Sequence, residues 1–144
     1  MRLYRHTQVG TLTIGLVGVA SLIPIVMYYD GAPLAIVLVF AGLLLLVAVM
    51  FGTLTVDVSR DYIRCMFGLG VIHRRIPTSK VVSVERVRNK WYYGWGIRYT
   101  PTGWMWNTSG LEAVLLTYDN GKQFRIGTDE PDQLVRSIRD ALGP

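Results

Sequence analysis

Two long apolar runs without a formal charge follow one another at the start of the chain. Residues 7–29 and residues 31–56 contain no Lys, Arg, Asp or Glu. About 20 apolar residues rising 1.5 Å each cross a hydrocarbon core of about 30 Å, so each run is long enough to span a bilayer once. Gly31 and Pro33 separate the runs and favour a tight turn over one continuous helix. The sequence therefore predicts a transmembrane helical hairpin.

Positive charges lie on one side of this predicted hairpin. Arg2 and Arg5 precede the first run, Arg60 and Arg64 follow the second, and the connecting turn carries Asp30 but no Lys or Arg. Lys and Arg next to membrane spans stay in the cytoplasm. We therefore expect a multi-pass protein of the cell (inner) membrane with both termini in the cytoplasm.

These features divide the chain into two units. Residues 1–54 are expected to hold an N-terminal segment and two transmembrane helices, over about residues 7–29 and 33–54. Residues 55–144 are expected to form a cytoplasmic domain. Small residues recur at helical spacing in both apolar runs, which favours packing of the two helices on each other. Pro24 is expected to bend the first helix.

Alternation of apolar and polar residues predicts strands over most of the second unit, because a period of two is typical of a half-buried strand. The predicted strands cover residues 54–59, 62–67, 71–77, 81–88, 96–107, 111–118 and 122–127. Pro101 and Gly103 interrupt the fifth. An amphipathic helix is expected to follow, with Pro131 in its first turn. Its apolar stripe consists of Leu134, Ile138, Ala141 and Leu142.

Turn residues predict how two strand pairs align. A turn at residues 60–61 places Asp57 opposite Arg64 and Val56 opposite Cys65. Asn120-Gly121 is the strongest hairpin signal in the chain, because both central residues of a type I′ turn need a positive φ. That turn would set Asp119 opposite Lys122. It would put five side chains on one face, namely Ala113, Leu115, Thr117, Phe124 and Ile126.

The string Trp-Tyr-Tyr-Gly-Trp-Gly-Ile-Arg at residues 91–98 is followed by Gly103-Trp104 and by Arg-Ile-Gly-Thr-Asp-Glu-Pro at residues 125–131. This pattern resembles the bacterial pleckstrin-homology-like (PH-like) domains that are fused to short hydrophobic N-terminal regions, over about the C-terminal two thirds of the chain. The order of seven antiparallel strands and one helix is also that of the pleckstrin-homology topology. The expected fold is therefore an α+β membrane protein, with a transmembrane hairpin followed by a PH-like bent sheet or barrel of seven antiparallel strands capped by a C-terminal helix. The resemblance implies no activity, because fold does not fix function.

Charge is unevenly distributed within the predicted domain. Residues 60–98 contain nine Lys and Arg against two acidic residues, whereas residues 99–144 contain four against six. Basic residues near an anionic leaflet contribute about 1 kcal/mol each. A lipid-headgroup site and a merely solvated, positive-inside surface both remain open. The candidate headgroup contacts are Arg74, Arg75, Arg86, Arg88 and Lys90.

Three consecutive aromatic residues, Trp91, Tyr92 and Tyr93, follow directly on these charges. Side chains alternate across a strand, so the three cannot all face one core and at least one is expected to be exposed. Exposed aromatic rings beside arginines are typical of binding hot spots. The predicted interaction segment therefore comprises Trp91, Tyr92, Tyr93 and Trp95, and Trp95, like Trp104 and Trp106, is expected in the core or in a groove. Nucleic-acid binding is disfavoured, because no known reader motif is present and the domain is tethered beside lipid.

Catalytic chemistry has one weak candidate. If Phe67 pairs with Val71 across the glycine turn, Cys65 lies opposite His73, but the sequence places no third group to orient the imidazole. An inert buried thiol beside a satisfied histidine is the favoured interpretation. No metal-ligand spacing and no nucleotide-binding motif is present, so we expect neither a metal nor a cofactor.

The sequence thus predicts a non-enzymatic, membrane-tethered PH-like domain that binds a protein partner or its own copies at the cytoplasmic membrane surface. Membrane lipids are the other expected partner, since the leading alternative is a module that binds anionic lipid headgroups. A Cys/His-dependent enzyme is the remote alternative.

Overall fold

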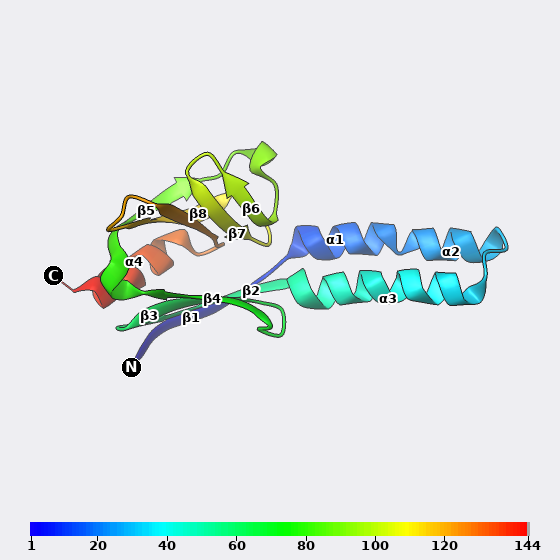
Figure 1. The fold of residues 1–144 in the computed structure, drawn as a ribbon, viewed down its shortest axis with the longest axis horizontal. Coiled ribbons are helices and arrows are strands. Elements are labelled where there is room, and N and C mark those ends of the chain that lie inside the picture. The colour runs from blue at the N-terminus through cyan, green and yellow to red at the C-terminus, as the bar shows by residue number, and fades with distance from the viewer. Residues whose placement is uncertain (144) are drawn as a thin grey trace.

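The computed structural model describes residues 1–143. Two rods of apolar helix lie side by side, antiparallel to each other, and project from one end of a β-rich domain (Figure 1). The first rod is α1 (Thr11–Ala20) followed by α2 (Leu22–Tyr29), and the second is α3 (Leu34–Phe51). Their mean hydropathies are 2.0 over 19 residues and 3.1 over 18 residues, and almost none of their surface is buried. Both are therefore long and apolar enough to cross a membrane, α3 measuring about 27 Å at 1.5 Å per residue.

The first rod is interrupted at Ser21, between α1 and α2. Pro24 lies three residues further on, has no N–H to donate and crowds the carbonyl four residues before it. At the interruption, the Ser21 hydroxyl donates to the carbonyl oxygen of Gly18, at 2.5 Å. The bend expected from Pro24 thus takes the form of a break one turn earlier.

The N-terminal segment is a strand of the domain, which the sequence analysis did not predict. β1 (Arg2–Val9) pairs antiparallel with β2 (Thr53–Ser59). The first helix consequently begins at Thr11 rather than near residue 7, and the second ends at Phe51 rather than at residue 54. Gly10 and Gly52 form the junction, where the Gly10 N–H donates to the Gly52 carbonyl at 2.7 Å. The helical hairpin is therefore an insertion between two paired strands of one domain.

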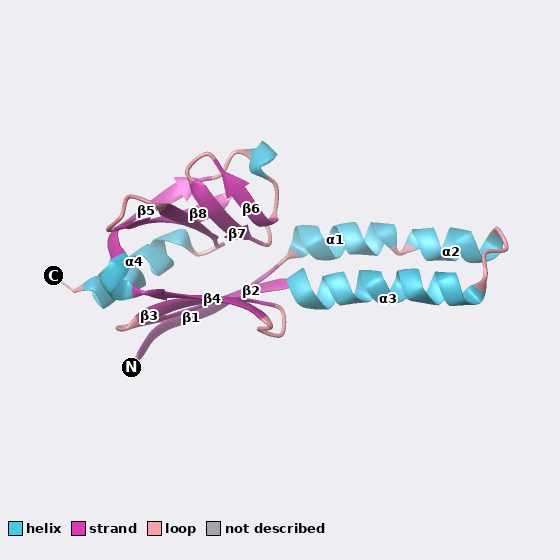
Figure 2. Ribbon diagram, in the orientation of Figure 1, coloured by secondary structure: helices cyan, strands magenta, loops and turns pink. Residues whose placement is uncertain are grey.

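The strands form two sheets (Figure 2). The first has the order β1-β2-β3-β4, and the second β5-β8-β9-β7-β6. Neighbours are antiparallel except β7 and β9, which are parallel. The remaining strands are β3 (Tyr62–Phe67), β4 (Ile72–Pro77), β5 (Val81–Arg88), β6 (Gly96–Thr100), β7 (Gly103–Asn107), β8 (Glu112–Tyr118) and β9 (Gln123–Gly127).

The predicted single sheet or barrel of seven antiparallel strands is thus corrected to nine strands in two sheets that do not close. One extra strand is β1. The other arises because residues 96–107 form two strands, β6 and β7, joined by a turn at Pro101-Thr102. Proline cannot donate a ladder hydrogen bond, so the chain reverses there instead of continuing.

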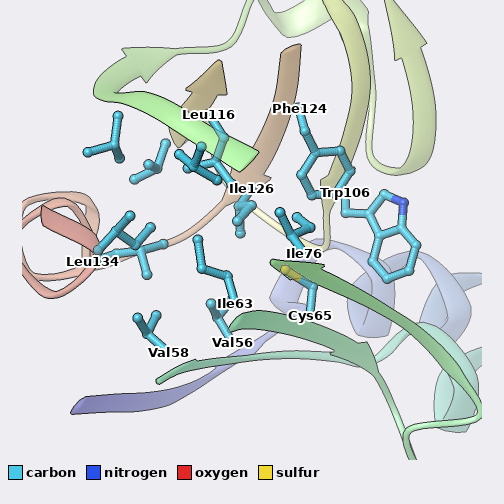
Figure 3. Packing of buried hydrophobic residues seen from close by; sticks show 14 of the residues in the cluster. Val56, Val58, Ile63, Cys65, Ile76, Trp106, Leu116, Phe124, Ile126 and Leu134 are labelled. Carbon is cyan, nitrogen blue, oxygen red and sulfur yellow. The ribbon is translucent and has the colours of Figure 1, made fainter. Parts of the chain in front are cut away.

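The core lies between the two sheets and is completed by α4 (Pro131–Leu142), as Figure 3 shows. The rings of Phe67 and Trp106 are 5.3 Å apart and those of Trp106 and Phe124 6.1 Å apart. The predicted apolar stripe of α4 supplies the fully buried Leu134 and Ile138. Because α4 packs on β1 and β2 of one sheet and on β5 and β8 of the other, it closes one side of the sandwich. The edge strands β4 and β6 lie on the other side.

One of the predicted registers is correct. Asp57 pairs with Arg64, and Val56 pairs with Cys65. The β8–β9 register is shifted from the prediction, because Leu116 pairs with Phe124.

The cause is a turn of three residues, 119–121, in place of two. Only Gly121 has a positive φ, of 78°, and the Asn120 side chain accepts a hydrogen bond from the Lys122 N–H at 3.0 Å. This is the geometry of a type I turn followed by a glycine bulge rather than a type I′ turn.

Candidate functional site

The predicted interaction segment forms a short turn of helix, η2 (Trp91–Tyr93), between β5 and β6. Trp91 is 74% and Tyr92 59% exposed, so at least one aromatic side chain is exposed as expected, although the segment is a helical turn and strand alternation is not the reason. Tyr93 is half-buried, and its ring centre lies 5.6 Å from the guanidinium carbon of the buried Arg125. Of the three consecutive rings, that of Tyr93 therefore packs against the domain, whereas those of Trp91 and Tyr92 are exposed.

Trp95 lies in a groove, one of the two places expected for it, rather than in the core. It is half-buried, and its indole N–H donates to the Gly110 carbonyl at 2.9 Å. With Arg98 it lines a groove of about 330 Å³ against Leu12 of α1 and Phe51 of α3. The core tryptophan is Trp106 instead, because two positive-φ glycines, at residues 94 and 96, turn Trp95 out at the start of β6.

The end of the domain that faces the helices carries the β3–β4 turn (Figure 1). The β3–β4 turn rests against α3 so closely that a Cβ on Gly68 would meet the carbonyl oxygens of Val49 and Met50. Leu69 and Val71 in this turn are 78% and 70% exposed. We call four exposed side chains the helix-proximal rim, namely Leu69, Val71, Trp91 and Tyr92. The first two lie in the turn that touches α3, and the other two lie in η2, which is followed closely by the groove residue Trp95.

Two of the candidate headgroup contacts are engaged in ion pairs within the domain. Arg86 contacts Glu112 at 3.1 Å and Asp132 at 2.8 Å, and Arg88 contacts Glu112 at 3.7 Å. Hydrogen bonds to the two carboxylates raise the pKa of Arg86 further above its ordinary value. These pairs link β5 to β8 and to α4, so Arg86 and Arg88 are poorly placed to bind a lipid.

The other three candidate contacts do not share one face of the domain. Lys90 precedes η2, with its amine 5.6 Å from the Tyr92 ring centre. Arg74 and Arg75 are neighbours on β4 and point to opposite faces of the sheet. The Arg74 guanidinium lies 4.5 Å above the ring of the core residue Phe124, whereas that of Arg75 lies 3.8 Å above Tyr62 on the outer face.

Arg74 lines a hollow of about 320 Å³ on the side of the sandwich that α4 leaves uncovered. Tyr99 and Trp104 stack edge to face beside it, with ring centres 5.3 Å apart, and are 73% and 47% exposed. The open-side groove is defined by Arg74, Tyr99, Thr102, Gly103, Trp104, Lys122 and Gln123. It thus combines two exposed aromatic rings with two cations.

The sequence analysis missed Tyr99, Trp104 and Lys122 as members of one surface. Trp104 and Trp106 alternate along β7 and so share a face, and Tyr99 is the cross-strand partner of Trp104. That pairing becomes visible only once residues 96–107 are recognised as a hairpin.

The proposed Cys65–His73 pair does not exist. Phe67 pairs with Ile72 rather than Val71, so Cys65 lies opposite Arg74 and the exposed His73 lies on the other face of the sheet. Cys65 is fully buried, and this burial raises the pKa of its thiol to about 12. The thiol is therefore protonated at neutral pH and inaccessible. Within residues 1–143, no cluster of three or more metal-ligating side chains is found.

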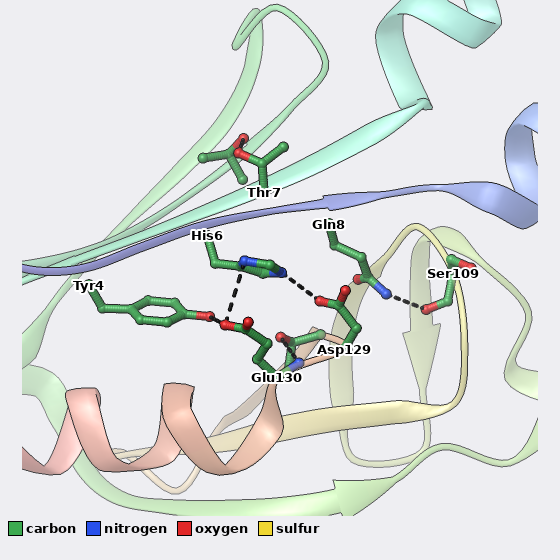
Figure 4. A network of polar contacts seen from close by, with 9 residues as sticks. Tyr4, His6, Thr7, Gln8, Ser109, Asp129 and Glu130 are labelled. Carbon is green, nitrogen blue, oxygen red and sulfur yellow. Dashed lines mark hydrogen bonds and ion pairs between the residues drawn. The ribbon is translucent and has the colours of Figure 1, made fainter.

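A polar network ties β1 to the start of α4 (Figure 4). The Tyr4 hydroxyl donates to a Glu130 carboxylate oxygen at 3.2 Å, and His6 Nε2 lies 2.7 Å from an Asp129 carboxylate oxygen. The Gln8 amide donates to the Ser109 carbonyl at 3.1 Å. Burial and the Glu130 carboxylate raise the pKa of Tyr4, so its hydroxyl remains a donor. These contacts fix the strand that leads into the apolar helices.

Searches of protein-family models and of curated proteins find no match to this chain.

Proposed function

We propose that this chain is a non-enzymatic, membrane-tethered interaction module with a PH-like β domain, whose open-side groove binds a protein partner or a second copy of the chain. Both termini are cytoplasmic in this proposal, and the helical hairpin spans the cell membrane. The observation that carries the proposal is the exposed Tyr99–Trp104 pair beside Arg74.

The anchor rests on the two apolar rods. Few of their residues are buried within the described chain. Such a large exposed apolar surface is unfavourable in water but not in lipid. The helix-proximal rim supports the same arrangement, because Trp and Tyr favour the membrane–water interface. The rim side chains would then lie at headgroup depth, at the ends of the spans.

The groove has the composition of a binding hot spot. Large aromatic residues and arginine dominate such sites, where truncation to Ala commonly costs about 2 kcal/mol or more of affinity. Tyr99 and Trp104 stabilise the fold little, because about three quarters and half of their surfaces remain in water. Exposed rings of this size bury their area when a partner covers them.

The test is site-specific crosslinking in native membranes. A photoreactive residue at Gln123, inside the groove, is expected to give a discrete crosslinked product in the full-length chain, and Trp104→Ala is expected to lower its yield about tenfold or more. Trp91→Ala is the matched control, because it removes an exposed tryptophan outside the groove, and it should leave the yield unchanged. The mass of the product tells a second copy from another protein. No product at position 123, or an equal loss with Trp91→Ala, would refute the proposal.

Anionic lipid headgroups are the second candidate ligand, and the helix-proximal placement of Lys90 and Arg98 favours it. Lys90→Gln with Arg98→Gln should lower the share of anionic over zwitterionic lipid that copurifies with the chain. Arg86→Gln is the control, since Arg86 is already paired with Glu112 and Asp132. Equal lipid shares in all three proteins would exclude headgroup selectivity.

A further inference from the structure

A second, more polar cavity lies between β4 and the β8–β9 turn. It measures about 260 Å³ and is lined by Arg74, Arg75, Ile76, Pro77, Lys80, Tyr118, Asp119, Asn120 and Lys122. Four of these side chains are cations and one is an acid. None of the four forms an ion pair with any of residues 1–143. The cavity therefore has three more cationic than acidic side chains in its lining, and its cations, unlike Arg86 and Arg88, have no ion-pair partner among these residues.

An unpartnered hydroxyl lies in the same wall. The Tyr118 hydroxyl oxygen is buried and makes no well-formed hydrogen bond within residues 1–143, although the Arg74 guanidinium lies beside it and acts to lower its pKa. Buried polar groups without a partner are rare and costly, and one at a functional site commonly awaits a ligand or water. Burial raises the pKa of Tyr118, so the group is a protonated donor. A ligand that completes this wall must accept hydrogen bonds and carry negative charge.

Backbone contacts hold the cavity wall in shape without the cationic side chains. The Asp119 N–H donates to the Lys80 carbonyl at 2.9 Å, and the Tyr118 N–H donates to the Lys122 carbonyl at 2.9 Å. Lys80 ends η1 (Thr78–Lys80), where the Thr78 hydroxyl donates to the Arg60 carbonyl at 2.6 Å. Both lysine side chains are exposed and free to turn toward a ligand.

The cavity is too far from the helix ends for lipid headgroups to reach its centre. Pro77 pairs with Tyr62, at the end of β3 remote from Phe67 and the turn that touches α3. Five strand residues at about 3.3 Å each place Pro77 about 17 Å beyond that turn. Headgroups add only about 5–8 Å to each side of the hydrocarbon core. The β8–β9 turn likewise lies at the far end of the domain (Figure 1).

We propose that this cavity binds the phosphoryl group of a water-soluble ligand, with Arg74, Lys80 and Lys122 as the cations and Tyr118 as a hydroxyl donor. The Arg74 guanidinium, already oriented over Phe124, offers planar donors suited to phosphate, and the lysines supply point charges. The site adjoins the open-side groove but needs no protein partner, so the two proposals fail separately.

Ligand-induced stabilisation of the full-length chain in zwitterionic nanodiscs tests this site, with pyrophosphate as the probe. Pyrophosphate should raise the melting temperature by about 3 °C over sodium chloride of equal ionic strength, because a ligand that binds only the folded state stabilises it. Lys80→Gln should abolish most of the shift and Tyr118→Phe should reduce it by at least half. Neither residue belongs to the open-side groove. Lys90→Gln makes the same charge change elsewhere and should leave the shift intact.

Three results would overturn the proposal. Pyrophosphate could act no better than chloride in the wild type. Lys80→Gln and Tyr118→Phe could retain the full shift, or Lys90→Gln could lose as much as Lys80→Gln, which would indicate nonspecific charge binding. The shift could also disappear in nanodiscs that contain phosphatidylglycerol, which would show that headgroups occupy the cavity.

Discussion

The four tryptophans illustrate how differently one residue type can serve the same small domain. Trp106 packs against Phe67 and Phe124 in the core. Trp95 donates its indole N–H to the Gly110 carbonyl. Trp91 and Trp104 are exposed. The sequence did not distinguish which of Trp95, Trp104 and Trp106 lies in the core. Trp104 and Trp106 share one face of β7, but only Trp106 lies over the core rings, whereas Trp104 packs on Tyr99 at the open side.

Cys65 makes alkaline pH destabilising. The fully buried thiol has a folded pKa of about 12 against an ordinary value of 9.0, so the folded state disfavours the thiolate. Its contribution to the free energy of unfolding is complete below pH 9 and is lost as pH rises toward 12, by about 1.4 kcal/mol per pH unit. Chemical unfolding of the wild type at pH 8 and 10 should show this loss, and Cys65→Ala should show about 1 kcal/mol less of it. Identical pH dependence in the two proteins would mean that the thiol is not buried.

Among the elements, the helices and the strand pair β2–β3 could be predicted well from the sequence. Long uncharged runs and strict alternation depend on local composition, which the sequence displays directly. β1 could not be recognised, because residues 2–9 do not alternate between apolar and polar. Its buried positions are Tyr4 and the polar Gln8, and its last residues overlap the start of the uncharged run. The Asn120-Gly121 signal identified the hairpin correctly but not its turn type, which depends on how the flanking strands pack in the core.

The geometry of the β8–β9 turn predicts how substitution of Gly121 and of Asn120 changes the stability of the fold. Gly121 has a φ of 78°, so Gly121→Ala should cost about 1–2 kcal/mol of stability. Asn120 has no positive φ, so Asn120→Gly should also destabilise, by about 0.5–1 kcal/mol, through the lost hydrogen bond to the Lys122 N–H and added chain entropy. Thermal melts of the two variants check this. A stabilising Asn120→Gly would indicate the two-residue type I′ turn instead.

At the scale of the whole molecule, the apolar helical hairpin connects two strands, β1 and β2, that pair with each other. β1 and β2 remain paired from Val9 opposite Thr53 down to Arg2 opposite Ser59, so both rods enter the domain through one rigid ladder. The Tyr4–Glu130 and His6–Asp129 contacts extend that ladder to α4. A change of tilt in the helices would therefore reach the domain directly rather than through a flexible linker.

This architecture predicts that residues 55–144 do not fold alone. That fragment lacks β1 and the core residues Tyr4 and Leu54, which are 7% and 1% exposed, and it leaves the edge of β2 unpaired. A fusion of residues 2–10 to residues 52–143 through a short glycine-asparagine turn should restore a soluble domain, because Gly10 and Gly52 already touch. Circular dichroism should show a cooperative melt for the fusion only. A fragment that melts as cooperatively as the fusion would show that β1 is dispensable.

The central claim is that the apolar hairpin spans the cell membrane and holds the β domain on its cytoplasmic face. Thiol labelling in intact cells tests it most directly, in a Cys65→Ala background. Asp30 lies at the exposed tip of the hairpin and Gln133 on the exposed face of α4. A membrane-impermeant maleimide should label Asp30→Cys in intact cells and Gln133→Cys only after the cells are broken. Labelling of Gln133→Cys in intact cells, with Asp30→Cys protected, would contradict the account.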